Sequence, residues 1–241
     1  MNIVITGAST GIGAETARVF AAGNELFLHY NSSEDAVQQV ASDVKAAGGR
    51  AHMCQADLRS ESGCKALYDQ IAAATQRIDV LVNNAGGLIR RQPCGEFEWS
   101  LMEEIFALNT FQAMMMTSLC LPLLQKAEAP VVVLISSVAA RNGAPGATIY
   151  GAAKGAVDSL TRGLAAELAP QVRVNAVAPG VIETPFHEKV STPEKMRQFK
   201  EKSALKRNGH AGHIASAIKL IVENDFLTGE TIDVNGGMFM R

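Results

Sequence analysis

A tyrosine and a lysine stand four positions apart in TIYGAAKGAV, residues 148–157, a stretch made mainly of small apolar residues. If residues 150–169 are helical, Tyr150 and Lys154 lie side by side on one helix face. A free tyrosine, with a pKa of about 10, is a poor proton donor at neutral pH, and a neighbouring ammonium group would lower that pKa. The pair is typical of general acid catalysis on a substrate oxygen.

A serine pair, Ser136 and Ser137, follows the apolar run PVVVLI, and Ser137 precedes Tyr150 by 13 residues. Parallel sheets open their ligand crevice at the carboxyl ends of the strands, so both side chains could reach the same crevice. A hydroxyl there can donate to an oxygen on which charge develops. Ser137, Tyr150 and Lys154 therefore form a candidate proton-donating site for the reduction of a carbonyl by a nicotinamide.

The candidate cofactor site is NIVITGASTGIGAETARVFAAG, residues 2–23, in which Gly7, Gly11 and Gly13 lie between an expected strand and an expected helix. Backbone N–H groups of such a turn approach a pyrophosphate only where side chains are absent, and the helix N-terminus adds partial positive charge. The spacing T-G-x-x-x-G-x-G differs from the commoner G-x-G-x-x-G. Its place in the first strand–helix unit favours nucleotide binding.

The stretch LHYNSSED, at the end of the second expected strand, bears on the choice of cofactor. A carboxylate at this point selects NAD through the adenosine ribose. Tyr30, Asn31 and Ser32 are neutral, and the first acids, Glu34 and Asp35, fall where the next helix should begin. Hydroxyl and amide groups at a helix N-terminus suit a phosphate. We therefore expect NADP(H) to be favoured over NAD(H).

Strand-like runs alternate with amphipathic stretches of helical length along the chain, which predicts βαβ units and a parallel sheet. The expected strands cover residues 2–6, 25–30, 50–56, 78–83, 130–136, 172–178 and 231–234. The central runs VLVN and VVVLI are apolar on both faces, as in strands covered by helices on both sides. The pattern predicts an α/β single-domain Rossmann fold over residues 1–241, with a seven-stranded parallel sheet and helices on both faces.

Residues 184–209 break this alternation with Pro185, Pro193 and the charged run EKMRQFKEKSALKR. The segment is too long for a simple crossover between strands. We interpret it as a helical flap over a substrate cleft, and a solvated surface helix is the alternative.

Composition limits the partners and the location of the protein. The chain has 241 residues and a formal net charge of −2, without a basic block that could follow a phosphate backbone, so nucleic acid is not expected as a partner. The amino terminus has no features of a signal peptide, and apolar runs such as PVVVLI are too short to span a bilayer. We expect a cytoplasmic protein with no membrane partner.

The cysteines and histidines do not predict a metal site. Four cysteines, Cys54, Cys64, Cys94 and Cys120, are scattered without a C-x-x-C pair, and no disulfide is expected. His210 and His213 could share a helix face, but no second cluster supplies further ligands. We interpret these two residues as belonging to the start of a helix.

Together these motifs resemble the short-chain dehydrogenase/reductase family, and within it the bacterial 3-oxoacyl carrier-protein reductases. The resemblance covers essentially the whole chain. Beside TGASTGIG and YGAAK, it rests on QADL, NNAG, LNT, ISS, NAVAPGVIETP and TGETIDVNGGM.

The resemblance implies roles for individual residues. The implied cofactor contacts are Gly7, Ser9, Thr10, Gly11, Ile12 and Gly13 at the pyrophosphate and adenosine ribose, with Tyr30, Asn31 and Ser32 nearby, Asp57 and Leu58 at the adenine, Asn84, Ala85 and Gly86 at the middle of the cofactor, Pro179, Gly180, Ile182 and Thr184 at the nicotinamide carboxamide, and Tyr150 and Lys154 beside the ribose. Asn109 would help to hold a water near the lysine in a proton relay. The implied catalytic group is Asn109, Ser137, Tyr150 and Lys154.

The activity implied is hydride transfer between a nicotinamide, preferably NADP(H), and a small-molecule carbonyl compound or secondary alcohol, as in a 3-oxoacyl reductase-like ketoreductase. An NAD-dependent sugar or polyol dehydrogenase is the second hypothesis. A nucleotide-binding regulator without catalysis is the third, and the complete set of catalytic residue types argues against it.

Basic residues that could receive an acidic carrier protein are scarce. Lys126 and Arg173 are present near the expected cleft, but Glu128 and Glu167 offset them. Electrostatic complementarity would favour a basic surface, so the sequence argues against docking of a carrier protein.

The loop GGLIRRQPCGEFEWS after the fourth expected strand carries Arg90 and Arg91. These side chains could meet an anionic substrate or face water, and we favour water.

Two expected helices, near 100–126 and 150–169, present soft or small side chains such as Met114 and Gly155. Core packing would explain methionines on a helix. Members of the family commonly pair these helices across a two-fold axis, so the resemblance implies a homotetramer, with a dimer as fallback.

Overall fold

A seven-stranded sheet forms the centre of the computed structural model, which describes residues 1–240 apart from the side chains of residues 188 and 189. The strand order is β3-β2-β1-β4-β5-β6-β9, and all neighbouring strands are parallel. The strands are β1 Asn2–Ile5, β2 Glu25–Tyr30, β3 Arg50–Gln55, β4 Val80–Asn83, β5 Val131–Ile135, β6 Arg173–Pro179 and β9 Thr231–Val234. The seven expected strands are therefore confirmed, with ends shifted by no more than two residues.

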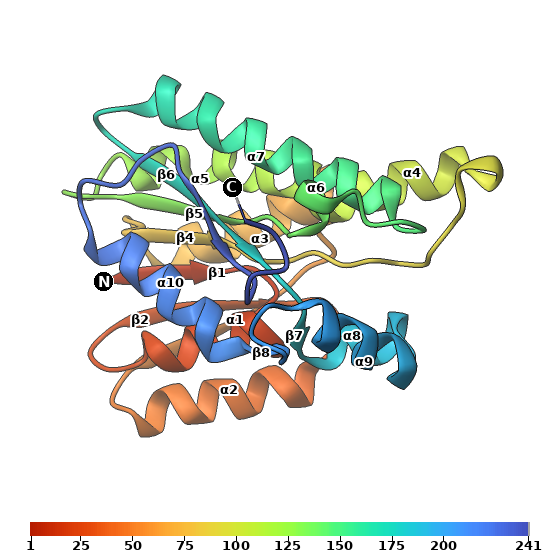
Figure 1. Cartoon of the computed structure of the whole chain (residues 1–241). Helices are drawn as coiled ribbons and strands as arrows, with labels where there is room; N and C mark the ends of the chain where they lie inside the picture. Colours follow the sequence, from red (N-terminus) through yellow and green to blue (C-terminus); the bar gives the residue numbers. More distant parts are fainter. Residues whose placement is uncertain (241) are drawn as a thin grey trace.

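Three helices cover each face of this sheet (Figure 1). One layer consists of α1 Gly11–Val19, α2 Glu34–Ala46 and α10 Ala211–Glu223; the other consists of α3 Glu61–Ala74, α5 Gln112–Leu124 and α7 Thr148–Leu168. Successive strand residues point to opposite faces, so Ile3 and Ile5 pack with the first layer and Val4 with the second. The predicted α/β Rossmann fold with helices on both faces is confirmed.

Short elements complete the described chain and lie mostly at the carboxyl end of the sheet (Figure 1). They are the 3₁₀ turn Cys94–Glu96, α4 Trp99–Phe106, the π-helical turn Ala107–Phe111, α6 Ala139–Asn142, β7 Ile182–Glu183, α8 Pro185–Val190, α9 Pro193–Lys202 and β8 Gly209–His210. The segment 184–209 thus contains two helices and returns to the fold where β8 pairs with β7.

The run Trp99–Leu124 is helical throughout and, by length and composition alone, is long and apolar enough to cross a membrane. This corrects the expectation that no apolar stretch reaches that length. Half of its most apolar stretch is buried inside the fold, where Met116, Cys120 and Leu124 pack in the core against α3. A helix buried in a protein core can be as long and as apolar as one that crosses a membrane. The packing of this run against the core accounts for its length and its apolar composition.

Buried cysteines contribute to packing, and the histidines 210 and 213 contribute to a helix start. All four cysteines are free, and three of them are buried. His210 is the N-cap of α10, and its backbone N–H donates to Nδ1 of His213 at 3.1 Å. The interpretation of both histidines as helix-start residues is therefore confirmed. Within residues 1–240, no cluster of three or more histidine, cysteine or acidic side chains could hold a metal ion.

Candidate active site

A cavity of about 810 Å³ opens where strands β1, β4, β5 and β6 end, the edge at which parallel sheets bind ligands. It brings together residues that are far apart in the sequence. The predicted site residues that line it are Gly7, Ser9, Thr10, Gly11, Ile12, Asn84, Ala85, Gly86, Ser137, Tyr150, Lys154, Pro179, Gly180, Ile182 and Thr184. The glycine-rich turn and the Ser–Tyr–Lys group thus share one cavity.

Seven predicted site residues do not line this cavity: Gly13, Tyr30, Asn31, Ser32, Asp57, Leu58 and Asn109. Gly13 supports the turn from behind, because a Cβ there would lie 2.2 Å from the Gly7 carbonyl oxygen. Tyr30 and Leu58 are buried in the two core clusters. Asn31 and Ser32 follow strand β2, and Asp57 follows strand β3. Asn109 lies beside Gly86, which does line the cavity.

The turn after β1 fits a dinucleotide pyrophosphate. Gly7 and Gly11 have φ of 65° and 55°, a left-handed conformation that glycine adopts at little cost. A Cβ on Gly7 would lie 3.0 Å from the Cα of Ala85, so the turn also passes close to the end of β4. The result is an open, side-chain-free backbone at the N-terminus of α1, which is the surface that a phosphate needs.

Thr6 ties this turn to the end of β4, a role that the sequence analysis missed. Its Oγ1 accepts hydrogen bonds from the N–H groups of Asn84 and Ala85, at 3.0 and 2.9 Å. The Asn84 side chain in turn donates to the carbonyl oxygens of Thr6 and Gly7, at 2.8 and 3.0 Å. The position of Thr6 as the first residue of the TGASTGIG motif could have indicated this role.

His29, also missed by the sequence analysis, supports the turn from β2. The Gly7 N–H donates to its Nδ1 at 2.9 Å, so the ring proton sits on Nε2, which lies 3.1 Å from the Ala56 carbonyl oxygen. Burial lowers the pKa of His29 and keeps the ring neutral, as this bridge requires. A histidine inside the apolar run ELFLHY was the signal.

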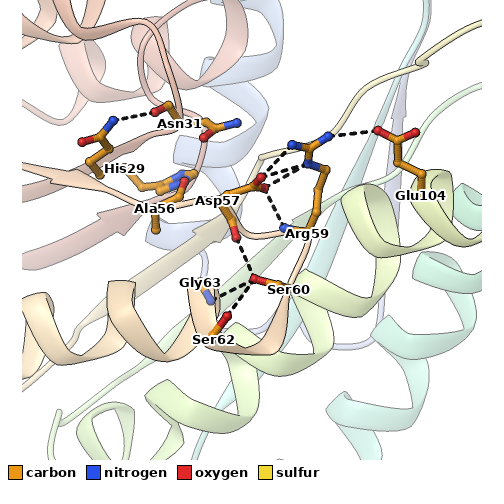
Figure 2. Close-up of polar contacts among 10 residues, drawn as sticks. His29, Asn31, Ala56, Asp57, Arg59, Ser60, Ser62, Gly63 and Glu104 are labelled. Carbon is orange, nitrogen blue, oxygen red and sulfur yellow. Dashed lines mark hydrogen bonds and ion pairs between the residues drawn. The ribbon is translucent and has the colours of Figure 1, made fainter.

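Asp57, predicted at the adenine, is paired with Arg59 in Figure 2. An Arg59 Nη2 lies 2.6 Å from Asp57 Oδ2, and this hydrogen bond lowers the pKa of Asp57. The other guanidinium nitrogen reaches Glu104 of α4 at 2.9 Å. The carboxylate is therefore ionised and held in one orientation just after the end of strand β3.

Lys154 is almost fully buried, with 3% of its surface exposed, and its Nζ donates to the Ile135 carbonyl oxygen at 2.8 Å. The Nζ lies 5.8 Å from the centre of the Tyr150 ring, so the i, i+4 spacing does bring the two side chains together. Burial lowers the pKa of Lys154 to about 8, and the charge of Asp158 opposes that shift.

Tyr150 lies half-buried at the inner end of the cavity and is hydrogen-bonded to Ser137. Burial raises the pKa of Tyr150 to about 12, and the hydrogen bond from Ser137 only partly opposes this. The net shift of the tyrosine pKa is therefore upward and not downward as expected, because desolvation of the phenolate outweighs the contacts that stabilise it. Tyr150 is a protonated donor over the whole neutral range.

Asn109 lies in the π-helical turn between α4 and α5, where the local widening turns its side chain inward. Its Nδ2 donates to the carbonyl oxygens of Gly87 and Ile105, and its Oδ1 accepts from the Gly87 N–H at 3.0 Å. A Cβ on Gly86 would lie 2.8 Å from Asn109 Oδ1 and 3.0 Å from Lys154 Nζ. Asn109 and Lys154 thus flank the same glycine.

The sequence of residues 1–195 matches the model of the short chain dehydrogenase family. Since that match covers most of the chain, and the relatives below are more than 30% identical, the chain belongs to this family. It is accordingly an enzyme, an NAD(P)-dependent oxidoreductase that acts on CH–OH groups.

Among curated relatives, an uncharacterized oxidoreductase of Mycobacterium tuberculosis is 36% identical over 98% of this chain and 90% of its own length. Cyclopentanol dehydrogenase of Comamonas is 31% identical over 98% of this chain and 95% of its own length. Among solved structures, the angucycline C-6 ketoreductase LanV with bound NADP has a TM-score of 0.91 and 25% identity, with 98% of this chain and 95% of that chain covered.

Proposed function

We propose that this enzyme is an NADP(H)-preferring carbonyl reductase, or in reverse a secondary-alcohol dehydrogenase, with Tyr150 as proton donor to the substrate oxygen. The observation that carries the proposal is the convergence of Ser137, Tyr150 and Lys154 on the cavity that also contains the glycine-rich turn. Relatives that are a cyclopentanol dehydrogenase and a ketoreductase support it. A 3-oxoacyl thioester is one substrate within this class.

In this mechanism the chain orients the carbonyl and manages its proton. When bound, NADPH supplies the hydride. The Ser137 hydroxyl donates to the carbonyl oxygen, and Tyr150 transfers its phenolic proton to that oxygen as negative charge develops there. The Lys154 ammonium stabilises the phenolate that remains, and Asn109 helps to hold a water through which Lys154 re-protonates it.

Replacement of Tyr150 by phenylalanine tests this assignment. We expect Tyr150→Phe to lower kcat by about 10²–10⁴-fold, because it removes the transferred proton and keeps the ring. The dissociation constant of NADPH, measured by fluorescence titration, should change little. Tyr68→Phe is the matched control, since Tyr68 lies on α3 and does not line the cavity. Undiminished turnover by Tyr150→Phe would refute the proposal.

The NADP preference rests on the surroundings of the strand β2 terminus. No carboxylate stands between Tyr30 and the start of α2 at Glu34, and the Ser33 side chain makes no capping hydrogen bond that would occupy the first turn of that helix. LanV, with bound NADP, is a structural neighbour that supports the choice.

Steady-state rates with both cofactors test this preference. We expect kcat/KM to be higher with NADPH than with NADH, and Ser32→Asp to reverse the order, since a carboxylate repels the 2′-phosphate. Ser42→Asp, on the exposed side of α2, is the control that adds the same charge elsewhere. A wild-type preference for NADH would contradict the proposal and favour the polyol dehydrogenase hypothesis.

A further inference from the structure

The outer wall of the cavity is aromatic where it approaches the proton donor. The centre of the Tyr150 ring lies 6.3 Å from that of Phe186, and the Phe186 ring meets His187 edge-on at 4.9 Å. His187 in turn lies 6.2 Å from Phe199. This row of rings leads from the reacting end of the site to helix α9.

Three cations stand beyond the rings and line the same cavity: Arg91, Lys195 and Lys202. Lys195 Nζ lies 5.4 Å from the centre of the Phe199 ring, and Arg91 Nε donates to the Val190 carbonyl oxygen at 3.3 Å. Within the part of the chain that the structure describes, none of the three cations forms an ion pair, and no aspartate or glutamate lines the cavity.

Two neighbouring arginines, unlike these three cations, form ion pairs. Arg90, next to Arg91, pairs with Glu98 at 2.6 Å and does not line the cavity. Arg197 on α9 pairs with Glu194. The positive charge of Arg91 acts on His187 and, after burial, contributes to holding its pKa down at about 4. Arg91, Lys195 and Lys202 therefore bring positive charge, without a paired carboxylate among the described residues, to one cavity wall, where the concave surface concentrates its attraction for an anion.

We propose that the substrate is an anionic carbonyl compound: a ketone joined through a short apolar chain to a carboxylate or a phosphate. The ketone lies at Tyr150 and Ser137, the apolar chain contacts Phe186 and Phe199, and the anion binds Arg91 with Lys195 and Lys202 around it. A planar guanidinium suits either oxyanion. The inference rests on the proposed function, and it takes up the alternative interpretation of the exposed Arg91, that of a residue meeting an anionic substrate.

The test compares matched substrates that differ in charge. The carboxylate arm uses 4-oxopentanoate, 5-oxohexanoate and 6-oxoheptanoate with their methyl esters, and the phosphate arm uses dihydroxyacetone phosphate with dihydroxyacetone. With NADPH saturating, we expect kcat/KM to favour the anion by at least about tenfold in one arm, the size of a charge-assisted hydrogen bond. The arm that responds identifies the anion.

Two variants assign that preference to residues. Arg91→Gln should bring the anion-to-neutral ratio close to one, and Arg90→Gln should leave the ratio as in the wild type. Higher salt should lower kcat/KM for the anion more than for its neutral partner. NADPH affinity is measured alongside, and if Arg91→Gln weakened NADPH and left the ratio unchanged, the cations would belong to the cofactor and the inference would fall.

Binding to Tyr150→Phe loaded with NADPH separates this inference from the proposed function. Calorimetric titration of each matched pair reports affinity without turnover, and we expect the anion to bind more tightly. Equal binding and equal turnover of anion and neutral partner, in every pair, would overturn the inference and leave the carbonyl reductase assignment intact. Retained turnover by Tyr150→Phe would refute the assignment itself.

Discussion

Tyr150 and Lys154 show how burial changes the chemistry of a pair that is recognisable by its spacing. The phenol stays protonated because its pKa is raised to about 12, and the lysine loses charge near pH 8 because its pKa is lowered to that value. At neutral pH the site therefore holds a neutral acid beside a cation. That state is suited to reduction, in which the oxygen must receive a proton.

The pH dependence of reduction follows from Lys154. Its folded-state pKa is below the ordinary value, so the charged form is present below pH 8 and is lost as the pH rises through it. We expect kcat for carbonyl reduction to fall above about pH 8, because the phenolate left by Tyr150 loses its stabilising charge. Steady-state assays from pH 6 to pH 10 measure this. A profile without a fall across that range would show that the charge of Lys154 is not needed.

A largely buried ion-pair cluster joins α6 and α7 to β9. Arg141 of α6 pairs with Asp158 of α7, and its Nε lies 3.2 Å from Asp233 Oδ1 on β9. Asp158 stands one turn after Lys154 on the same helix and opposes the lowering of the lysine pKa. The cluster therefore fixes the helix that carries Tyr150 and Lys154 and also affects the charge of Lys154.

Removal of Arg141 tests the contribution of this cluster to stability. Arg141→Gln removes the cation that pairs with the buried Asp158 and the half-buried Asp233, and we expect the free energy of unfolding to fall by about 3 kcal/mol. Arg18→Gln, which breaks an exposed pair with Asp43, should cost less than about 1 kcal/mol. Chemical denaturation of both variants gives the comparison, and similar losses would contradict the expected difference.

Large apolar side chains are exposed along the helical run 99–124. Trp99, Phe111 and Met114 have 72%, 53% and 41% of their surfaces exposed. Apolar side chains gathered along one helical run mark a candidate surface for association. They lie in the helical region for which the family resemblance implies pairing across a two-fold axis, so we propose a homotetramer formed partly through this region.

Sedimentation equilibrium tests the assembly. We expect the wild-type mass to be that of four chains, and Phe111→Glu to reduce it to that of a dimer, because a charge in an apolar interface is costly. Leu205→Glu, an exposed apolar residue on the segment 184–209, is the control and should leave the mass unchanged. A stable wild-type monomer would contradict the proposed assembly.

The sequence by itself determined the order of the strands and helices, the glycine-rich turn and the spacing of Ser137, Tyr150 and Lys154. These features are readable because periodicity, turn geometry and the i, i+4 relation depend on residues close together in the chain. The sequence did not predict the π-helical turn at Asn109, and it predicted the two helices of 184–209 only as one helical flap.

The tertiary structure alone decided the supporting contacts and the charge states. Thr6 and His29 hold the cofactor turn through partners some 20 to 80 residues away in sequence. Arg90 and Arg91 are adjacent and chemically identical, yet one pairs with Glu98 and the other lines the cavity. Burial and ion pairing depend on residues brought together from distant strands and helices. Local sequence patterns therefore predict neither the pKa values of Tyr150 and Lys154 nor which of the two arginines lines the cavity.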